Sequence, residues 1–297
     1  MNQANALLGL ITETSLHAGA GSSVGAIDLP IQREGHNGWP CVFGSAVKGS
    51  LRDRAEAVFG LDSEDVFTVF GPNTMNASDN AGAIAVGDAR LLLLPVRSLT
   101  SSFKWVTCAE ALNRFKRLAG MLGVGGFIFD VPTAAGTEAL TAQDTGDLFL
   151  EEYRFTQRAD TDKLPKVIEV LARLVQRIDA QAELTRRLVV VSDDMFSHLV
   201  QAAVPVNAHI ALDSKSKTVA GGALWYEETL PPETLLYVPL MAANSRREKK
   251  AMSATDVLGK VTGLFIDKDK PKPWLQLGGN ETVGMGWCAI TVLKNGG

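Results

Sequence analysis

Short hydrophobic runs bounded by glycine, proline or polar residues predict several strands along the chain. The run ALLGLIT (6–12) predicts an N-terminal strand, and 207–231 predicts two strands around a polar turn. Alternation of hydrophobic and polar residues indicates one more strand at 146–155. Other predicted strands cover 81–98, 186–194, 234–243 and 274–294, the last of them interrupted by glycines.

Hydrophobic residues spaced three or four positions apart predict a first helix over residues 44–60. These residues are Val47, Leu51, Ala55 and Val58. Ser45 is its predicted N-cap, and Gly60 is its predicted stop. Thr107 and Glu110 have the spacing of a capping box ahead of a second helix, which is amphipathic.

Three further helices are predicted at 165–178, 195–203 and 257–265. Pro165 would occupy the favoured first position of one helix, and Ser253 with Asp256 would cap another. Strands and helices alternate in an irregular order with several hairpins, which favours an α+β fold over a doubly wound parallel sheet. No linker of useful length divides the chain, so we expect one domain over residues 1–297, with insertions.

Composition places the chain among ordinary globular proteins, with 46% hydrophobic and 21% charged residues. The 29 basic and 33 acidic residues give a net charge of -4, so a nucleic-acid role requires locally clustered cations. The N-terminus lacks the pattern of a secretory signal, and no apolar run is long enough to span a bilayer. We therefore expect a cytoplasmic protein without a membrane partner.

Motifs exclude several common enzyme classes. Cys41, Cys108 and Cys288 are scattered and are predicted to be reduced thiols, and no zinc-binding spacing occurs. The late glycine loop GGNETVGMG fits neither a P-loop nor a dinucleotide-binding fingerprint. No G-x-S-x-G elbow is present, which argues against the commonest serine hydrolases.

Three glycine-containing segments are candidates for binding an anion: the loop 17–34, the helix start GSAVKG and the glycine loop 278–286. Glycine turns let backbone N–H groups approach a phosphate, and a helix N-terminus adds a favourable dipole. Each signal alone is weak, because such a loop is about as often a simple connector.

Together these blocks resemble a known family. The order of LHAGAGSSVGAIDLPIQRE, GSAVKGSLRDRA, GALWYEETLPPETLLY and LGGNETVGMGW is similar to that in the RAMP superfamily of CRISPR proteins. The similarity reaches both ends of the chain and is strongest to the backbone subunits of type III-B (Cmr) effector complexes.

The resemblance implies an RRM-like, ferredoxin-type palm with insertions, one of them a β-hairpin thumb at about 204–232. It also implies a set of partners. Copies of such a subunit stack as a helical filament on a guide RNA, together with other type III-B subunits, and bind a single-stranded target RNA.

The resemblance also suggests which residues contact RNA. Ser45 and the first-turn amides of the predicted helix could hold a phosphate, and Lys48, Arg52 and Arg54 could form a basic strip. The glycine loop implies further backbone contacts with the guide, and its candidate residues are Gly278, Gly279, Gly284 and Gly286.

Asp28 matches the aspartate on which target-RNA cleavage depends in this family. Attack of a 2'-hydroxyl on the adjacent phosphate needs alignment, proton removal and charge neutralisation. Asp28 could act as a base or hold a divalent cation, Mg²⁺ or Mn²⁺. His17 could protonate the leaving oxygen or simply order the loop. Glu227 could help to arrange the site, and Trp225 or Tyr226 could stack on a displaced base.

Two alternatives remain open at the level of sequence. The chain could be a catalytically silent RNA-binding scaffold, in which case Asp28 only forms a turn before Pro30. It could also be a stand-alone metal-dependent phosphohydrolase that uses Asp28 with Glu34 or Asp53. The remaining histidines, His36, His198 and His209, are interpreted as structural.

Overall fold

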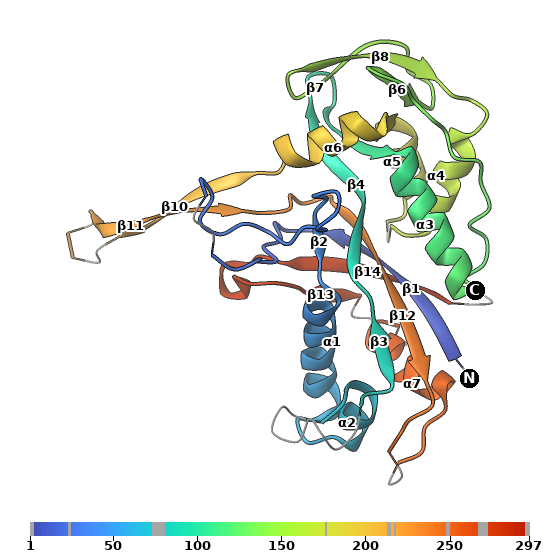
Figure 1. The fold of residues 1–297 in the computed structure, drawn as a ribbon, viewed down its shortest axis with the longest axis vertical. Coiled ribbons are helices and arrows are strands. Elements are labelled where there is room, and N and C mark those ends of the chain that lie inside the picture. The colour runs from blue at the N-terminus through green and yellow to red at the C-terminus, as the bar shows by residue number, and fades with distance from the viewer. Residues whose placement is uncertain are drawn as a thin grey trace.

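The computed structural model describes residues 3–22, 25–72, 81–175, 177–212, 215–216, 218–247, 250–266 and 273–294. The chain has a mixed α+β fold, as predicted (Figure 1). The strands are β1 (Gln3–Thr12), β2 (Cys41–Val42), β3 (Ile84–Val86), β4 (Ala89–Ser98), β5 (Ser102–Cys108), β6 (Glu138–Thr141), β7 (Gly146–Leu150), β8 (Tyr153–Ala159), β9 (Leu188–Val191), β10 (Val206–Leu212), β11 (Val219–Glu228), β12 (Leu235–Ala243), β13 (Trp274–Gln276) and β14 (Trp287–Lys294). The helices are α1 (Gly44–Phe59), α2 (Glu64–Phe70), α3 (Ala109–Leu122), α4 (Leu164–Ala172), α5 (Ala180–Arg187), α6 (Asp193–Ala202) and α7 (Ala254–Gly263), with a 3₁₀ turn η2 (Glu281–Val283).

A 12-stranded sheet organises the body of the molecule. Its main order is β13-β14-β1-β12-β4-β5-β9-β6-β8-β7, with β2 paired to β4 and β3 paired to β12. The strand β1 pairs antiparallel with both β12 and β14. The N-terminal strand therefore has a partner on each side and is not an edge.

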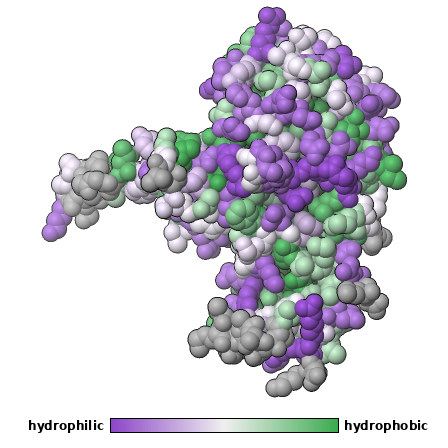
Figure 2. Space-filling view, viewed as in Figure 1, coloured by the Kyte–Doolittle hydropathy of each residue, from purple (hydrophilic) through white to green (hydrophobic). Residues whose placement is uncertain are grey.

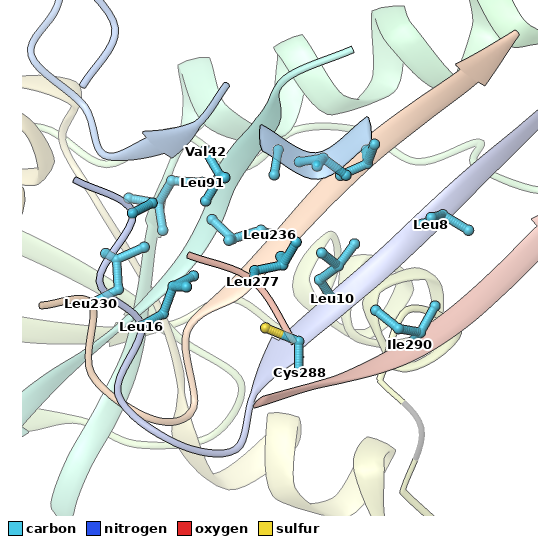
Figure 3. Packing of buried hydrophobic residues seen from close by; sticks show 14 of the residues in the cluster. Leu8, Leu10, Leu16, Val42, Leu91, Leu230, Leu236, Leu277, Cys288 and Ile290 are labelled. Carbon is cyan, nitrogen blue, oxygen red and sulfur yellow. The ribbon is translucent and has the colours of Figure 1, made fainter. Parts of the chain in front are cut away.

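Hydrophobic residues of β1 alternate between two cores, because successive side chains of a strand point to opposite faces. Leu8 and Leu10 lie in the core that includes residues of α1 and α7. Leu7 and Ile11 lie in the core that includes residues of α3, α4 and α5. Figure 3 shows Leu10 close to Ile290 of the neighbouring strand β14. Burial on both faces explains why this strand is hydrophobic almost throughout.

The strands β10 and β11 form a separate two-stranded hairpin that extends away from the body (Figure 1). It lies inside the segment 204–232 that the sequence predicted as a hairpin. Ile210 and Leu224 face each other on it and are 51% and 53% exposed. Figure 2 shows hydrophobic surface along this extension. A lone two-stranded hairpin is marginally stable in water, so its stability depends on contacts at its base.

Two predicted helix caps are wrong. The N-cap of α1 is Phe43, whose carbonyl accepts the first helical hydrogen bonds, and Ser45 lies inside the helix. The N-cap of α3 is Cys108 and has no side-chain hydrogen bond. Thr107 cannot cap α3 because it is still part of β5, where it pairs with Val190 of β9.

Three other details of the sequence prediction also differ. Residues 146–155 are not one strand but the hairpin β7–β8, which turns at Glu151 with a φ of 49°. The helix α4 ends at Ala172, and Pro165 is its second residue. Val58 is 58% exposed, because the buried stripe of α1 ends at Ala55.

The predictions for the start of α7 and for the cysteines are confirmed. Ser253 and Asp256 form the expected capping box at the start of α7. Cys41, Cys108 and Cys288 are free and buried, and burial raises the pKa of Cys41 and of Cys288 to about 12. Within the described residues, none of the helices is long and apolar enough to cross a membrane.

The two-sided core predicts a large effect of truncating β1. Leu10 is fully buried, so Leu10→Ala should lower the free energy of unfolding by about 2–5 kcal/mol, through lost burial and a residual cavity. Leu61 is 71% exposed, and Leu61→Ala should change stability by less than about 0.5 kcal/mol. Denaturant unfolding of both variants measures the difference, and equal effects would contradict this account of the core.

Candidate functional site

Asp28 is exposed, and its loop is fixed to the end of β11. Its Oδ2 accepts a hydrogen bond from the Tyr226 amide at 2.8 Å. The next residue, Leu29, donates its amide to the Tyr226 carbonyl at 3.1 Å, and its carbonyl accepts the Glu228 amide at 3.0 Å. The carboxylate therefore binds the hairpin strand, 198 residues away in sequence. This contact gives Asp28 a defined position at the hairpin base.

Glu228 anchors the same loop from the buried side. One carboxylate oxygen accepts the Ile31 amide at 3.0 Å, and the other forms an ion pair with Arg33. The Arg33 guanidinium also donates to the carbonyls of Gly38 at 2.9 Å and Val200 at 3.1 Å. Because Val200 belongs to α6, one guanidinium joins the loop, a helix and the hairpin. Sequence reasoning missed Arg33, which carries no local motif.

His17 and Glu227 lie together, in a buried polar cluster on the other side of the hairpin base. His17 Nδ1 lies 2.8 Å from the Glu228 carbonyl oxygen and 3.4 Å from Glu227 Oε1. Asn280 donates to the same Glu227 oxygen at 2.6 Å. His209 Nε2 lies 3.9 Å from Glu227 Oε2. The sequence named His17 and Glu227 as candidates, but it gave Asn280 no role and treated His209 as structural.

The two aromatic residues before Glu227 have different surroundings. Trp225 stacks on His209 with ring centroids 5.5 Å apart and an interplanar angle of 14°. Tyr226 is 42% exposed. Of these two candidates for base stacking, Trp225 already has an aromatic partner within the hairpin.

The glycine loop packs against the segment that leads to His17. Gly279 donates its amide to the His17 carbonyl at 2.9 Å, and Gly286 donates to the Ser15 carbonyl at 2.8 Å. Gly284 donates to Glu281 at 2.8 Å. Gly278 has a φ of +77°, and a Cβ there would collide with the His17 carbonyl oxygen. The amides of Gly279, Gly284 and Gly286 thus already have acceptors within the chain.

Two of the three basic residues predicted to form a strip on α1 bind groups of the chain itself. Arg52 binds Glu56 at 2.7 Å and the Gly71 carbonyl at 3.1 Å, whereas Arg54 binds the Leu264 carbonyl at 3.0 Å. Burial lowers the pKa of Lys48, and the nearby Arg52 charge lowers it further. Ser45 is exposed on the first turn of the helix.

A carboxylate already lies at the start of α1. Asp88 accepts the Gly44 amide at 2.7 Å, and the Gln32 side chain accepts the Phe43 amide at 2.6 Å. Both donors that begin the helix therefore have partners. Phosphate binding through these two amides would require their displacement.

Two hollows lie beside the candidate residues. One, of about 450 Å³, is bordered by the loop on both sides of Asp28 and by Arg33, Gln201 and Glu228. The other, of about 410 Å³, lies between α1 and the glycine loop and includes Asp53, Arg54, Glu281 and Trp287. Among the RNA-binding candidates, Arg54 lines this second hollow, whereas Ser45, Lys48, Arg52 and the four candidate glycines are not among its lining residues.

The acids of the phosphohydrolase alternative are not gathered around one ion. Within the described part of the chain, no group of three His, Cys, Asp or Glu side chains could hold a metal. Burial would raise the pKa of Glu34, but hydrogen bonds from Arg114 and Asn37 outweigh it and lower the pKa. Glu34 is thus engaged in an ion pair with Arg114. Asp53 lines the hollow between α1 and the glycine loop, away from Asp28. A single exposed carboxylate such as that of Asp28 supplies too few ligands to hold a cation by itself.

Comparison with known proteins finds relatives that match this chain along nearly its whole length. CRISPR system Cmr endoribonuclease Cmr4 of Pyrococcus furiosus is 36% identical over 98% of this chain and 97% of its own length. A crystal structure of oligomeric Cmr4 from Pyrococcus furiosus has a TM-score of 0.74 and 29% identity, and the match covers 98% of each chain.

A more distant structure shares the fold. A chain of the type III-B Cmr-beta complex bound to cognate target RNA has a TM-score of 0.72 at 20% identity, over 97% of this chain and 96% of that one. The model of the RAMP superfamily matches residues 10–289. The chain therefore belongs to the RAMP superfamily.

Proposed function

We propose that this chain is a repeated backbone subunit of a type III-B CRISPR ribonucleoprotein, which binds guide RNA and cleaves complementary target RNA through Asp28. The full-length relative named as a Cmr endoribonuclease supports this function. The observation that carries the proposal is the exposed Asp28 carboxylate, held at the hairpin base by the Tyr226 amide. A carboxylate with only a turn-forming role would bond within its own turn, as short polar side chains commonly do.

We further propose that β1, α1, β4, β12, α7 and β14 form an RRM-like palm. These elements follow one another in the β-α-β-β-α-β order of ferredoxin-like folds. Their strands lie in the order β14-β1-β12-β4, and each neighbouring pair is antiparallel. The projecting β10–β11 hairpin would then be the thumb.

Self-assembly would provide contacts for this thumb. Ile210 and Leu224 are about half exposed on a hairpin that projects from the body of the single chain (Figure 1). The related Cmr4 structure from Pyrococcus furiosus is oligomeric. We therefore assign the hairpin a contact with a neighbouring copy in a helical filament that also contains other type III-B subunits.

Cleavage would begin with attack of a target 2'-hydroxyl on the adjacent phosphorus atom. Asp28 would remove the hydroxyl proton, and the hairpin base would hold the strand in the in-line geometry that this attack requires. The net charge of -4 leaves guide binding to local cations, for which Lys48, Arg52 and Arg54 of α1 are the proposed residues.

The reaction is proposed to need a divalent cation, Mg²⁺ or Mn²⁺, held by Asp28 together with RNA phosphate oxygens. Mg²⁺ commonly binds through one or two carboxylates plus substrate phosphates, which suits a single exposed aspartate. Such an ion would neutralise phosphate charge during the attack.

The assembled complex with Asp28→Asn tests the catalytic role. Cleavage of labelled target RNA should fall by about 100-fold or more, because the amide cannot accept the hydroxyl proton, whereas target binding should persist. The exposed Asp62 provides the control Asp62→Asn, which should cleave normally. Unchanged cleavage by Asp28→Asn would instead support the silent-scaffold alternative.

Metal removal tests the cation. Chelation with EDTA should stop cleavage by the assembled wild-type complex without releasing the target RNA, and added Mg²⁺ or Mn²⁺ should restore it. Products should carry 2',3'-cyclic phosphate and 5'-hydroxyl ends. Full activity in EDTA would rule out the cation, and 5'-phosphate ends would rule out 2'-hydroxyl attack.

A further inference from the structure

The larger of the two hollows, of about 450 Å³, is lined by two kinds of residue. Ala26, Ile27 and Pro30 of the loop are apolar, whereas Arg33 and Gln201 are polar. Gln201 belongs to the last turn of α6. Small-ligand sites commonly have volumes of about 300–1,000 Å³, with mostly apolar walls and a few polar groups that fix orientation. The hollow has the size and the composition of such a site.

The lining of this hollow carries no net charge. Among the described residues that line it, only Arg33 and Glu228 are charged, and they form an ion pair with each other. Binding of an RNA phosphate depends on a surplus of positive charge, which this pair does not leave. The hollow therefore suits an uncharged group better than a phosphate.

The Arg33 guanidinium is fixed in its own plane. It donates to the carbonyls of Gly38 at 2.9 Å and Val200 at 3.1 Å, and it also pairs with Glu228. Because the donors of a guanidinium lie in its plane, these bonds occupy its edge, and a further flat ligand is best placed over a face. The Arg33 side chain is 23% exposed. Guanidinium planes stack on unpaired nucleobases, so Arg33 provides a fixed platform for a flat ring.

Gln201 provides a polar group that can bind the edge of such a ring. Its side chain is exposed and has no hydrogen-bond partner among the residues that the structure describes. Its amide nitrogen lies 3.6 Å from the position of a Cβ on Gly38, which lines the same hollow. A carboxamide offers two donors and an acceptor, and it pairs in a bidentate manner with N6 and N7 of adenine.

The hollow adjoins the proposed catalytic carboxylate. Ile27 and Pro30 line it on either side of Asp28 in the sequence, and consecutive Cα atoms are only about 3.8 Å apart. Asp28 itself is held by the Tyr226 amide at 2.8 Å. A base in the hollow would therefore belong to a nucleotide at the proposed cleavage point. Holding that base would restrict its ribose and so help to align the 2'-hydroxyl.

We propose that this hollow binds an unstacked base of the target RNA, that of the nucleotide whose 2'-hydroxyl attacks. The face of the base lies on the Arg33 guanidinium, and its edge binds the Gln201 side chain. Gln201 is then a specificity-determining residue, and adenine is the preferred base. This inference rests on the proposed function and adds a base subsite to it. The competing occupant, an apolar side chain of a protein partner, offers nothing for Gln201 to bind.

Target RNAs that differ at one nucleotide test the subsite. The nucleotide at one cleavage point carries adenine, cytosine, uracil or no base, and the guide is changed with each base to keep the two strands complementary. With the assembled wild-type complex, cleavage at that point should be about 10-fold faster for adenine than for uracil or for the abasic nucleotide, as expected for one bidentate pair. Cleavage at the unchanged points of the same RNA is the internal control.

Variants of Gln201 assign the preference to this residue. Gln201→Leu should cleave the adenine target about 10-fold more slowly and leave the abasic target unaffected. Gln201→Glu should move the preference from adenine to cytosine, because a carboxylate accepts a hydrogen bond from cytosine N4. Gln181→Leu, at the exposed start of α5, is the matched control and should cleave every target normally. Both glutamines are exposed, so these substitutions should have little effect on folding.

The outcomes separate this inference from the function on which it rests. Equal cleavage of all four targets by the wild-type complex would overturn the base subsite and leave cleavage through Asp28 in place. Equal slowing of the adenine and abasic targets by Gln201→Leu would also overturn it, and would assign Gln201 to the structure or to a protein contact. Normal cleavage by Asp28→Asn would instead overturn the proposed function, whichever base is preferred.

Discussion

Pairing between the Asp28 loop and the last residues of β11 is the constraint on which the candidate site depends. Three consecutive residues of β11 each bind a different residue of the candidate site. The Tyr226 amide binds Asp28, the Glu227 carboxylate lies against His17, and the Glu228 carboxylate binds Arg33. Strand alternation accounts for the separation of the Glu227 and Glu228 carboxylates, because side chains on successive residues of a strand point to opposite sides. A change in register by one residue would therefore disperse the whole site.

The hydrophobic sheet makes this arrangement rigid. Leu16 and Leu230 form an isolated bridge just behind the polar cluster, and both are almost fully buried (Figure 3). Leu16 follows β1 closely, and Leu230 lies between β11 and β12, so the core fixes both chains that enter the site. The side chains of His17, Glu227 and Glu228 at the hairpin base can then be buried with hydrogen-bond partners, as buried polar groups in proteins usually are.

Sequence could predict the elements whose pattern is local. The strand β1 could be predicted because it is a continuous hydrophobic run, which reflects its burial. The start of α7 could be predicted because Ser253 and Asp256, only three residues apart, have the spacing of a capping box. Predictions failed where distant pairing decided the outcome. Thr107 has the spacing of a cap, but pairing with β9 keeps it in a strand. Asp28 could be singled out by resemblance, whereas Asn280 could not, since its contact with Glu227 spans 53 residues and follows no motif.

The burial of all three cysteines has a practical consequence. Cys41, Cys108 and Cys288 are the only thiols of the chain, and none is accessible in the folded state. Reagents such as maleimides react with exposed thiolates, which these buried groups rarely form. A single cysteine introduced at the exposed Ile210 of the hairpin would thus accept a fluorophore without prior removal of native thiols. The wild-type chain is therefore a ready background for optical measurements on the hairpin.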